Sequence, residues 1–354
     1  MNSKMNRRRN SIANIGLSLL LCAIGFNGLS QYKTKKYIRK NKGPEIVDCD
    51  NEKIYARGLL SEGSKIFTGN SDGSLYYFNL EKESVNLIFK MDNIEEMRDV
   101  ERVDDQVIAM LSGDDSHVVK IDNYGNTEMI QSDLFKGVFL DGMDFEGRRG
   151  FLMGDPNDSI FRLFISDDYG TTWTACKSSP TPEKGEAGFA ASGTNVQVLN
   201  DSTYVFVSGG EKSRFFKTND RGDSWKEVAL PYYPGESSGA FSMHFSTDSV
   251  GVIVGGDYLQ SDLKLNTTYY TTDGGESWFN SENPPRGYRS CVYEVDGIYY
   301  CCGRNGIDFS SDGGKNWTPF ANGVFFSLGN TEEKLIATSK EGKLYLFNLL
   351  VLKD

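Results

Sequence analysis

The stretch Thr271-Thr272-Asp273-Gly274-Gly275-Glu276-Ser277-Trp278 decides the fold, because three other segments of the chain repeat its pattern. The other copies read SDDYGTTW over residues 166–173, TNDRGDSW over 218–225 and SSDGGKNW over 310–317. Their common frame is Ser/Thr-x-Asp-x-Gly-x-Ser/Thr/Asn-Trp, and it contains all four tryptophans of the protein. A motif that recurs four times predicts a fold built from repeated units.

Each copy predicts a tight turn between two strands. The first strand ends at the Ser or Thr, and the Asp two residues later accepts hydrogen bonds from nearby backbone N–H groups. The Gly allows a positive φ or a close approach of the backbone, and the Trp brings a large apolar ring to bury between sheets. The residues with this structural role are Asp168, Gly170, Trp173, Asp220, Gly222, Trp225, Asp273, Gly275, Trp278, Asp312, Gly314 and Trp317.

The spacing of the tryptophans predicts the architecture. Trp173 and Trp225 are 52 residues apart, Trp225 and Trp278 are 53 apart, and Trp278 and Trp317 are 39 apart. A period of about 40 to 50 residues is typical of a β-propeller blade, a small sheet that needs neighbours to bury its faces. The many short β-rich runs between Gly, Asp and Asn turns agree with a single all-β domain.

Cutting the chain into four-strand units from Glu45 onward predicts seven blades. Six or eight are also compatible, because the first two units lack the full motif. The first blade is expected at 54–60, 65–69, 75–80 and 85–90, whereas the last unit has only three strands, at 324–328, 334–338 and 344–349. We therefore expect Glu45-Ile46-Val47-Asp48-Cys49 to supply its fourth strand, because closing the ring removes open sheet edges.

The charge balance limits the partners. The chain has 38 basic and 49 acidic residues, and the basic ones concentrate near the N-terminus, so the propeller itself is acidic. Nucleic-acid binding needs clustered Lys and Arg, so we expect no nucleic-acid partner. Cationic ligands, metal ions or neutral glycans fit better, and we expect a monomer.

The first 30 residues predict a bacterial-type export signal. Lys4 and Arg7–Arg9 precede an apolar run at 15–26, and the small residues Gly28 and Ser30 suit cleavage after Ser30. The apolar run is shorter than the roughly 20 residues of a membrane span. An uncleaved anchor is the alternative, and it would be the one contact with a membrane.

Residues 31–43 form a basic leader, and residues 44–354 form the propeller. The positive charge of the leader, on the C-terminal side of the apolar run, opposes translocation. We nevertheless expect export, to the periplasm, the cell surface or the medium.

The pair Asp296-Gly297 predicts a two-residue hairpin turn that places Val295 opposite Ile298. Counting back along both strands places Cys291 opposite Cys302. A cross-strand disulfide and two buried thiols both fit this register. Buried thiols are the preferred interpretation, because free Cys packs as a small apolar residue.

Candidate ligand-binding residues come from the turns between the second and third strands of each blade. These turns share one face of the propeller, which we call the mouth face, with the inter-blade connections, and the Trp motifs lie on the opposite face. Long loops gathered on one face are where propellers bind. Four of five such turns carry a carboxylate just after glycine, and the candidate catalytic acids are Asp114, Asp155, Glu211 and Asp257.

Other residues on the mouth face are candidates for ligand contacts. These are His117, Asp158, Arg214, Tyr258 and Arg304, and the first strands add Ser192 and His244, together with Asp144 and Asn195, around the central axis. We assign no metal site, because His117 near Asp114 has no identifiable third ligand.

The fourfold motif resembles the Asp-box, or bacterial neuraminidase repeat, of sialidase-like β-propellers. In sialidases this resemblance implies three arginines for the substrate carboxylate, a Tyr/Glu nucleophile pair and an Asp acid/base. The Arg-Ile/Leu-Pro segment of those enzymes is absent from this sequence, and nothing selects Arg57, Arg214 and Arg304 as the trio. A glycoside hydrolase or lyase that uses the carboxylates of the mouth face is the alternative function, since glycoside hydrolysis needs two of them.

The sequence is more similar to Asp-box propellers related to the photosystem II stability/assembly factor, through GFAASGTN at 188–195 and VGGDY at 254–258. This similarity covers roughly residues 45–350 and implies a fold. We expect no cofactor, because no G-x-G-x-x-G opens a helix and no Cys/His cluster could hold iron or copper. The leading hypothesis is an exported seven-bladed propeller that binds or assembles a protein or glycan ligand.

Overall fold

The computed structural model describes residues 43–91, 95–114, 116–122, 125–130, 133–157 and 159–350. The predicted export signal, the basic leader up to residue 42 and the candidate residue Asp158 lie outside this part of the chain. Within it the fold is all-β, with a single 3-10 turn, η1 (Asp133–Phe135).

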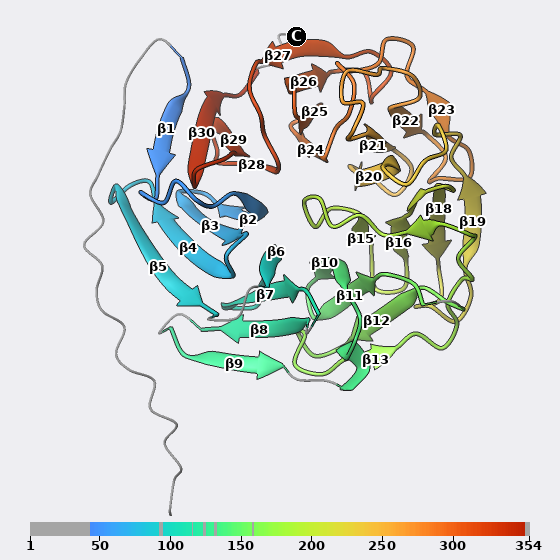
Figure 1. The fold of residues 1–354 in the computed structure, drawn as a ribbon, viewed down its shortest axis with the longest axis horizontal. Helices are drawn as coiled ribbons and strands as arrows, with labels where there is room; N and C mark the ends of the chain where they lie inside the picture. Colours follow the sequence, from blue (N-terminus) through green and yellow to red (C-terminus); the bar gives the residue numbers. More distant parts are fainter. Residues whose placement is uncertain are drawn as a thin grey trace, which may run out of the picture. The chain divides into compact units, whose positions relative to one another are not determined.

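Seven antiparallel sheets surround a common axis as the blades of a propeller (Figure 1), so the predicted fold is confirmed. The strands are given from the axis outward. Blade 1 contains β2 (Ala56–Glu62), β3 (Lys65–Asn70), β4 (Ser74–Asn79) and β5 (Ser84–Lys90). Blade 2 contains β6 (Glu96–Val103), β7 (Gln106–Ser112), β8 (His117–Ile121) and β9 (Thr127–Ile130). Blade 3 contains β10 (Leu140–Glu146), β11 (Arg149–Gly154), β12 (Arg162–Ser166) and β13 (Thr174–Ala175). Blade 4 contains β15 (Val196–Val198), β16 (Tyr204–Val207), β18 (Arg214–Thr218) and β19 (Lys226–Ala229). Blade 5 contains β20 (Ser238–Phe245), β21 (Gly251–Asp257), β22 (Thr268–Thr271) and β23 (Phe279–Asn280). Blade 6 contains β24 (Cys291–Val295), β25 (Ile298–Gly303), β26 (Gly306–Ser310) and β27 (Thr318–Ala321).

Blade 7 takes strands from both ends of the described chain. Three come from the C-terminal end, β28 (Leu328–Asn330), β29 (Lys334–Thr338) and β30 (Lys343–Asn348), and β1 (Glu45–Asp48) adds the outer one. β1 runs antiparallel to β30, with Glu45 opposite Leu346 and Asp48 opposite Lys343. The predicted closure by the N-terminal strand is therefore confirmed. The innermost strand begins at Leu328, later than expected.

Two short strands outside the blades tie loops of the mouth face together. β14 (Glu186–Ala187) pairs with β17 (Gly209–Gly210), and Gly209 in turn lies opposite Gly239 of β20. The sequence does not predict this pairing, because two-residue strands carry no periodic pattern.

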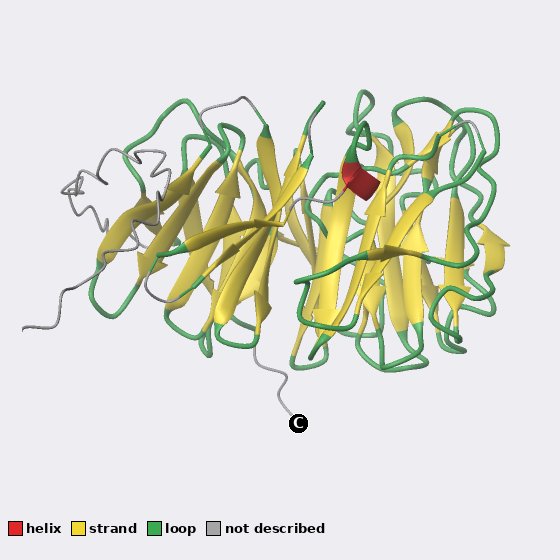
Figure 2. Cartoon of the chain, turned by 90° about the horizontal axis from the view of Figure 1, so that it is seen from below, coloured by secondary structure: helices red, strands yellow, loops and turns green. Residues whose placement is uncertain are grey.

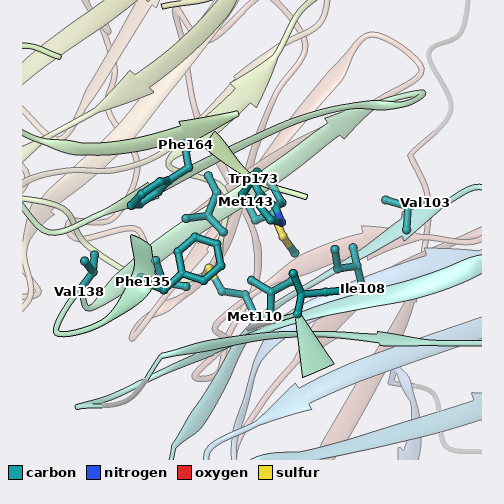
Figure 3. Packing of buried hydrophobic residues seen from close by; sticks show 12 residues of the cluster. Val103, Ile108, Met110, Phe135, Val138, Met143, Phe164 and Trp173 are labelled. Carbon is teal, nitrogen blue, oxygen red and sulfur yellow. The ribbon is translucent and has the colours of Figure 1, made fainter. Parts of the chain in front are cut away.

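The hydrophobic core lies between neighbouring blades. Figure 3 shows the cluster between blades 2 and 3, with Val103, Ile108, Met110, Phe135, Val138, Met143, Phe164 and Trp173. Phe135 meets Phe164 edge-on at a centroid distance of 5.1 Å, and Phe145 meets Trp173 at 5.7 Å. The expected role of the motif tryptophan, a plate buried between sheets, is confirmed here.

The Asp-box turns have the predicted hydrogen bonds. In the first copy Asp168 Oδ1 accepts the backbone N–H of Thr172 at 2.8 Å and the hydroxyl of Ser166 at 2.9 Å. The Gly170 N–H donates to the same Ser166 hydroxyl oxygen at 2.9 Å. In the later copies the hydrogen bonds from Ser224 and Ser277 hold the pKa of Asp220 and of Asp273 at about 2. These carboxylates are thus ionised acceptors in structural turns.

The glycine of each Asp-box lies against the preceding blade. A Cβ on Gly170 would come within 2.5 Å of Ile108 and 3.0 Å of Phe145. Gly275 lies in the same way against Phe215, and Gly314 against Val252. The motif therefore fastens one blade to the next.

The innermost strands are joined by hydrogen bonds from a side chain on one blade to the backbone of the next. Asp99 accepts the Met143 N–H at 2.8 Å, and Asp144 accepts the Val198 N–H at 2.6 Å. Gln197 accepts the Phe245 N–H at 2.8 Å, and Ser242 accepts the Val292 N–H at 2.9 Å. We call this set of bonds the hub. Because the backbone groups involved are buried, each bond satisfies a donor that would otherwise lack a partner.

The loops form two layers at opposite ends of the strands (Figure 2). The Asp-box turns connect third to fourth strands, such as β12 to β13, and lie on one face. The turns between second and third strands and the inter-blade connections lie on the other, the mouth face. The predicted assignment of turns to faces is confirmed.

The hairpin that carries the cysteines agrees with the prediction, whereas the start of β15 does not. Cys291 lies opposite Cys302 and Val295 opposite Ile298, as predicted, and both cysteines are free thiols. Ser192 and Asn195 were expected on an innermost strand, but β15 begins at Val196, so both lie in the preceding loop. That placement was wrong, because the connection into blade 4 extends through Asn195 before the strand begins.

Candidate functional site

Four innermost strands carry a β-bulge at the same place, close to the mouth face. The extra residue is Arg57 in β2, Arg98 in β6, Asp141 in β10 and Phe241 in β20, since the pairing skips each of them. A bulge leaves one residue out of the ladder and re-aims its side chain. We call these four the bulge residues, and they form the floor of the mouth.

The two bulge arginines are held by aromatic rings and one carboxylate. The Arg57 guanidinium lies over Tyr55 at 5.2 Å and over Phe326 at 5.6 Å, and Arg98 lies over Phe139 at 5.2 Å. Glu96 receives a 2.7 Å ion pair from Arg98, and its second oxygen accepts the Tyr55 hydroxyl at 2.5 Å. Both arginine side chains are partly exposed, Arg57 by 24% and Arg98 by 19%.

The loop from Gly188 to Asn195 covers the end of the hub, seen in Figure 1 as the pale green loop beside β15. The bulge arginines donate to its carbonyls, Arg98 to Ala190 at 2.7 Å and Arg57 to Ala191 at 3.0 Å. These bonds reach across blades 1 and 2, far from the loop in sequence. We call residues 188–195 the cover loop, because they lie over the end of the hub. Their carbonyl groups also hold the two arginines at the mouth.

The cover loop is also anchored on the far side of the axis. Phe189 stacks on the bulge residue Phe241, with ring centroids 4.1 Å apart. Ser192 donates to the Ser290 carbonyl at 2.9 Å in blade 6, and its hydroxyl lies 2.7 Å from that of Thr194. Ser192 therefore has a structural hydrogen bond.

Two carboxyl groups lie beneath the cover loop. Burial raises the pKa of Asp141 well above its usual value, and the neighbouring Asp155 raises it further. Burial also raises the pKa of Asp155, although the Gly188 N–H, which donates to it at 3.1 Å, acts in the opposite direction. The charge of Arg98 acts in the direction opposite to burial on both groups, so the two carboxyl groups lie within electrostatic reach of this arginine.

Two predicted ligand residues meet at the edge of the mouth. Arg304 is exposed and stands over the Tyr258 ring at 5.9 Å. Burial raises the pKa of the neighbouring Tyr288, and the charges of Arg57 and Arg304 oppose that change. Both arginines therefore lie near this one phenol.

Arg214, another candidate ligand residue, has its guanidinium bound by other residues of the protein. Its Nε donates to Glu186 at 2.9 Å, its Nη1 to Glu227 at 2.6 Å and its Nη2 to the Thr181 carbonyl at 2.8 Å. Its side chain is buried, as is that of Glu186. Arg214 holds the connection between blades 3 and 4, and Arg98 stands at the mouth where the sequence suggested Arg214.

The remaining predicted residues are spread over the mouth face and the core. Asp114 and Glu211 are exposed in separate turns. Asp257 is buried and accepts the Ser237 hydroxyl at 2.7 Å, and His117 lies 3.8 Å from Glu95. His244 packs on Tyr293 and Tyr299, and burial lowers its pKa to about 4, which keeps it neutral. The four candidate acids do not form one group.

Sequence reasoning missed Arg98, Asp141 and Phe241. A signal for them exists in the aligned inner strands, which read Arg57-Gly58, Arg98-Asp99, Asp141-Gly142 and Phe241-Ser242. A small or hub-forming residue follows the bulge residue each time. To see this pattern, the innermost strands of all blades must be aligned with one another. The Asp-boxes do not provide that alignment, because they mark only the turns between the third and fourth strands.

No helix in the described residues is long and apolar enough to span a membrane. Over the same residues no group of three or more His, Cys, Asp or Glu side chains is placed to hold a metal ion.

The fold and site together define an Asp-box β-propeller with basic and aromatic side chains at its mouth. Residues 161–301 match the family model described as Sortilin-Vps10, "Sortilin, neurotensin receptor 3". A search of curated proteins finds no match.

Several solved structures share the fold. YCF48 from Cyanidioschyzon merolae is 13% identical, with 86% of this chain and 99% of that chain covered and a TM-score of 0.59. The WD40 β-propeller domain of Doa1 is 9% identical, with 89% and 97% covered and a TM-score of 0.61. The computationally designed Ika8 protein is 11% identical, with 87% and 100% covered and a TM-score of 0.53. At these identities the likeness shows the fold alone.

Proposed function

We propose that this protein is an exported β-propeller that binds an anionic group of a protein or glycan ligand at its mouth, as a binding or assembly module. The observation that carries the proposal is the pair of bulge arginines. The Nε–H groups of Arg57 and Arg98 are buried and donate to no acceptor within the described part of the chain. Both side chains are partly exposed, so an anion at the mouth would bind their accessible N–H groups, because Arg presents several N–H groups in a fixed fork.

The electrostatics of the mouth support an anionic ligand. Glu96 is shared between Arg57 and Arg98, at 3.9 and 2.7 Å, so one carboxylate faces two guanidinium groups. Arg304 adds a further exposed charge at the edge. On a chain of net charge −11, such a local positive field attracts and orients anionic groups.

The comparisons support a binding role. Sortilin-Vps10 propellers are typically ligand-binding modules, and the match spans blades 4 and 5 and parts of blades 3 and 6. The assembly role is proposed from the sequence resemblance to propellers related to the photosystem II stability/assembly factor, and YCF48 from Cyanidioschyzon merolae shares the fold.

A glycoside hydrolase or lyase is the second candidate function. The observation that favours it is Asp155, whose raised pKa suits a general acid, with Asp141 beside it. We expect that a panel of chromogenic glycosides detects no turnover. Turnover that disappears in Asp155→Asn, or in Asp257→Asn and Glu211→Gln, would replace the binding proposal with an enzymatic one.

Binding is tested with arrays of glycans and peptides that do or do not carry acidic groups. We expect the wild-type chain to retain acidic members, and Arg57→Gln or Arg98→Gln to weaken their binding by roughly tenfold or more, the range for a lost charge-assisted hydrogen bond. Arg148→Gln is the matched control, because Arg148 is exposed on the opposite face. Equal binding by all three variants would contradict the proposal.

Export rests on the sequence of residues 1–30. Fusion of these residues to a reporter that is active only outside the cytoplasm should give activity, and replacing Leu19 and Leu20 by Asp should abolish it. An inactive wild-type fusion would refute the export proposal.

A further inference from the structure

Four large apolar side chains are exposed on the mouth face: Ile160 in blade 3, and Tyr233, Leu259 and Leu265 in or beside blade 5. The last three lie in two adjacent loops. The exposed fraction is 57% for Tyr233, 73% for Leu259 and 57% for Leu265. Tyr233 lies in the connection between blades 4 and 5, and the leucines lie in the turn 258–267 of blade 5. Asn266 of that turn donates to the Pro231 carbonyl at 2.8 Å, so the two loops are neighbours. We call Tyr233, Leu259 and Leu265 the apolar rim.

The turn that carries the leucines is held at its start by Asp257. Its Oδ1 accepts the Leu259 N–H at 2.8 Å and the Ser237 hydroxyl at 2.7 Å, and its Oδ2 accepts the Gln260 amide at 2.9 Å. Burial opposes ionisation of this carboxyl, but these hydrogen bonds outweigh burial and lower its pKa. Leu259 is therefore fixed beside an ionised capping residue.

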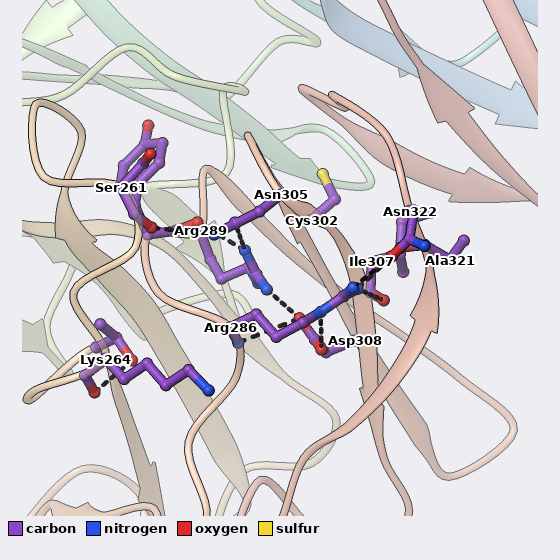
Figure 4. Close-up of polar contacts among 12 residues, drawn as sticks. Ser261, Lys264, Arg286, Arg289, Cys302, Asn305, Ile307, Asp308, Ala321 and Asn322 are labelled. Carbon is purple, nitrogen blue, oxygen red and sulfur yellow. Dashed lines mark hydrogen bonds and ion pairs between the residues drawn. The ribbon is translucent and has the colours of Figure 1, made fainter.

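A second anchor holds the middle of the turn (Figure 4). The Ser261 carbonyl accepts the Tyr288 N–H at 3.0 Å and the Asn305 amide at 3.2 Å. Asn305 in turn accepts a 2.7 Å hydrogen bond from Arg289, a fully buried arginine that is ion-paired with Asp308. The leucines thus stand on a framework tied into the core of blade 6.

Basic side chains flank the apolar rim. Lys264 and Arg304 are exposed, and neither forms an ion pair with a carboxylate in the described residues. Arg304 stands over Tyr258, the first residue of the turn. An ordered apolar surface that borders unpaired cations favours a partner that is apolar and acidic.

We propose that the apolar rim docks a polypeptide segment that presents aliphatic side chains together with acidic residues. The aliphatic groups cover Leu259, Leu265 and Tyr233, and the acidic residues face Lys264 and Arg304. Leucine side chains offer a sugar no hydrogen bond, and sugar hydroxyls buried against them would lose their water without a new partner. This inference rests on the proposed function, and within it names a polypeptide as the ligand.

The test measures binding of labelled twelve-residue peptides to the full chain by fluorescence anisotropy. The peptides alternate Leu with Asp, Ser with Asp, Leu with Lys, and Leu with Ser. We expect the Leu/Asp peptide to bind most tightly. The double variant Leu259→Ser/Leu265→Ser should lose roughly tenfold in affinity, as for two interface anchors. Phe279→Ser is the matched control, because Phe279 is 51% exposed on β23, outside the mouth.

The two proposals fail in different ways. The proposal of a docking site at the apolar rim is refuted if the leucine double variant binds the Leu/Asp peptide as tightly as the wild type does. It is also refuted if the wild type binds the Ser/Asp peptide as tightly as the Leu/Asp peptide. Binding of no peptide, with retention of acidic glycans, refutes the rim and leaves the anionic mouth standing. If instead Arg57→Gln and Arg98→Gln bind normally while the leucine variant does not, the rim stands and the arginine site fails.

Discussion

Asp99 of blade 2 accepts the backbone N–H of Met143 in blade 3 at 2.8 Å, and this hub bond joins two innermost strands. Burial raises the pKa of Asp99 to about 8, against hydrogen bonds from Met143 and Val100 that lower it. Burial likewise raises the pKa of the next hub acid, Asp144, to about 7. The hub therefore contains two carboxyl groups that titrate near neutral pH.

The free energy of unfolding should decrease as the pH rises from 5 to 9. Folded Asp99 keeps its proton up to about pH 8, whereas an unfolded Asp releases it near the usual value of 3.8. The folded chain therefore binds more protons between these values, and the free energy of unfolding decreases with pH. Urea unfolding at pH 5, 7 and 9 measures this slope. Asp99→Asn should flatten it, and Asp105→Asn, an exposed residue in the same blade, should not. An unchanged slope in Asp99→Asn contradicts the assignment.

The Asp-box glycine should be sensitive to the size of its side chain. Gly170 and Gly147 both have a positive φ, of 74° and 56°, but only Gly170 faces other atoms, those of Ile108 and Phe145. Gly147→Ala should cost about 1 kcal/mol for the left-handed backbone. Gly170→Ala should cost about 2 kcal/mol more, because the core is overpacked. Equal midpoints in chemical unfolding would show that the glycine is not an inter-blade contact.

Loss of the closing strand should open the ring. Removing residues 1–49 deletes β1 and leaves β30 as an exposed edge, whereas removing residues 1–42 keeps β1 intact. We expect the longer truncation to lower the free energy of unfolding by at least about 3 kcal/mol and the melting temperature by roughly 5 to 10 °C. It should also aggregate through the free edge, as size-exclusion chromatography would detect. Identical behaviour of the two truncations would contradict the role of β1.

The ion pair of Arg214 with Glu186 should be structural. Glu186→Gln leaves a buried guanidinium without its main counter-charge and should destabilise the fold by about 3 kcal/mol or more. Arg304→Gln, at an exposed position, should change stability by less than about 0.5 kcal/mol. Thermal unfolding separates the two. If the Glu186→Gln variant is stable but no longer binds acidic ligands, Arg214 belongs to the ligand site and its role is not structural.

The fold could be predicted because its signal is local. Each Asp-box fits its turn within eight residues, and the tryptophans mark the blade period. The closing strand followed from counting strands, since the last unit lacked one and residues 45–49 were left over; the strand observed there is Glu45–Asp48. The hairpin at Asp296-Gly297 predicted its own register, because a two-residue turn fixes every pair behind it.

The site could be predicted only in part, because its contacts are non-local. Arg98 lies in a strand whose sequence has no feature that sets it apart from the other strands. Only the pairing with β7 shows that Arg98 is the bulge residue. The cover loop takes its position from Arg57 and Arg98, more than 90 residues away in sequence. The partner of Arg214 could not be predicted either, since its counter-charge Glu186 is supplied by a two-residue strand that no periodicity reveals.

The β-bulges have a consequence for how this protein can diversify. A bulge residue takes no part in the strand pairing that holds its blade together, so its side chain can change while the frame stays the same. Arg57, Arg98, Asp141 and Phe241 already show that a cation, an acid and an aromatic ring are accepted at equivalent positions. The mouth is thus a set of exchangeable positions on a constant scaffold, and new ligand specificity can arise there by single substitutions.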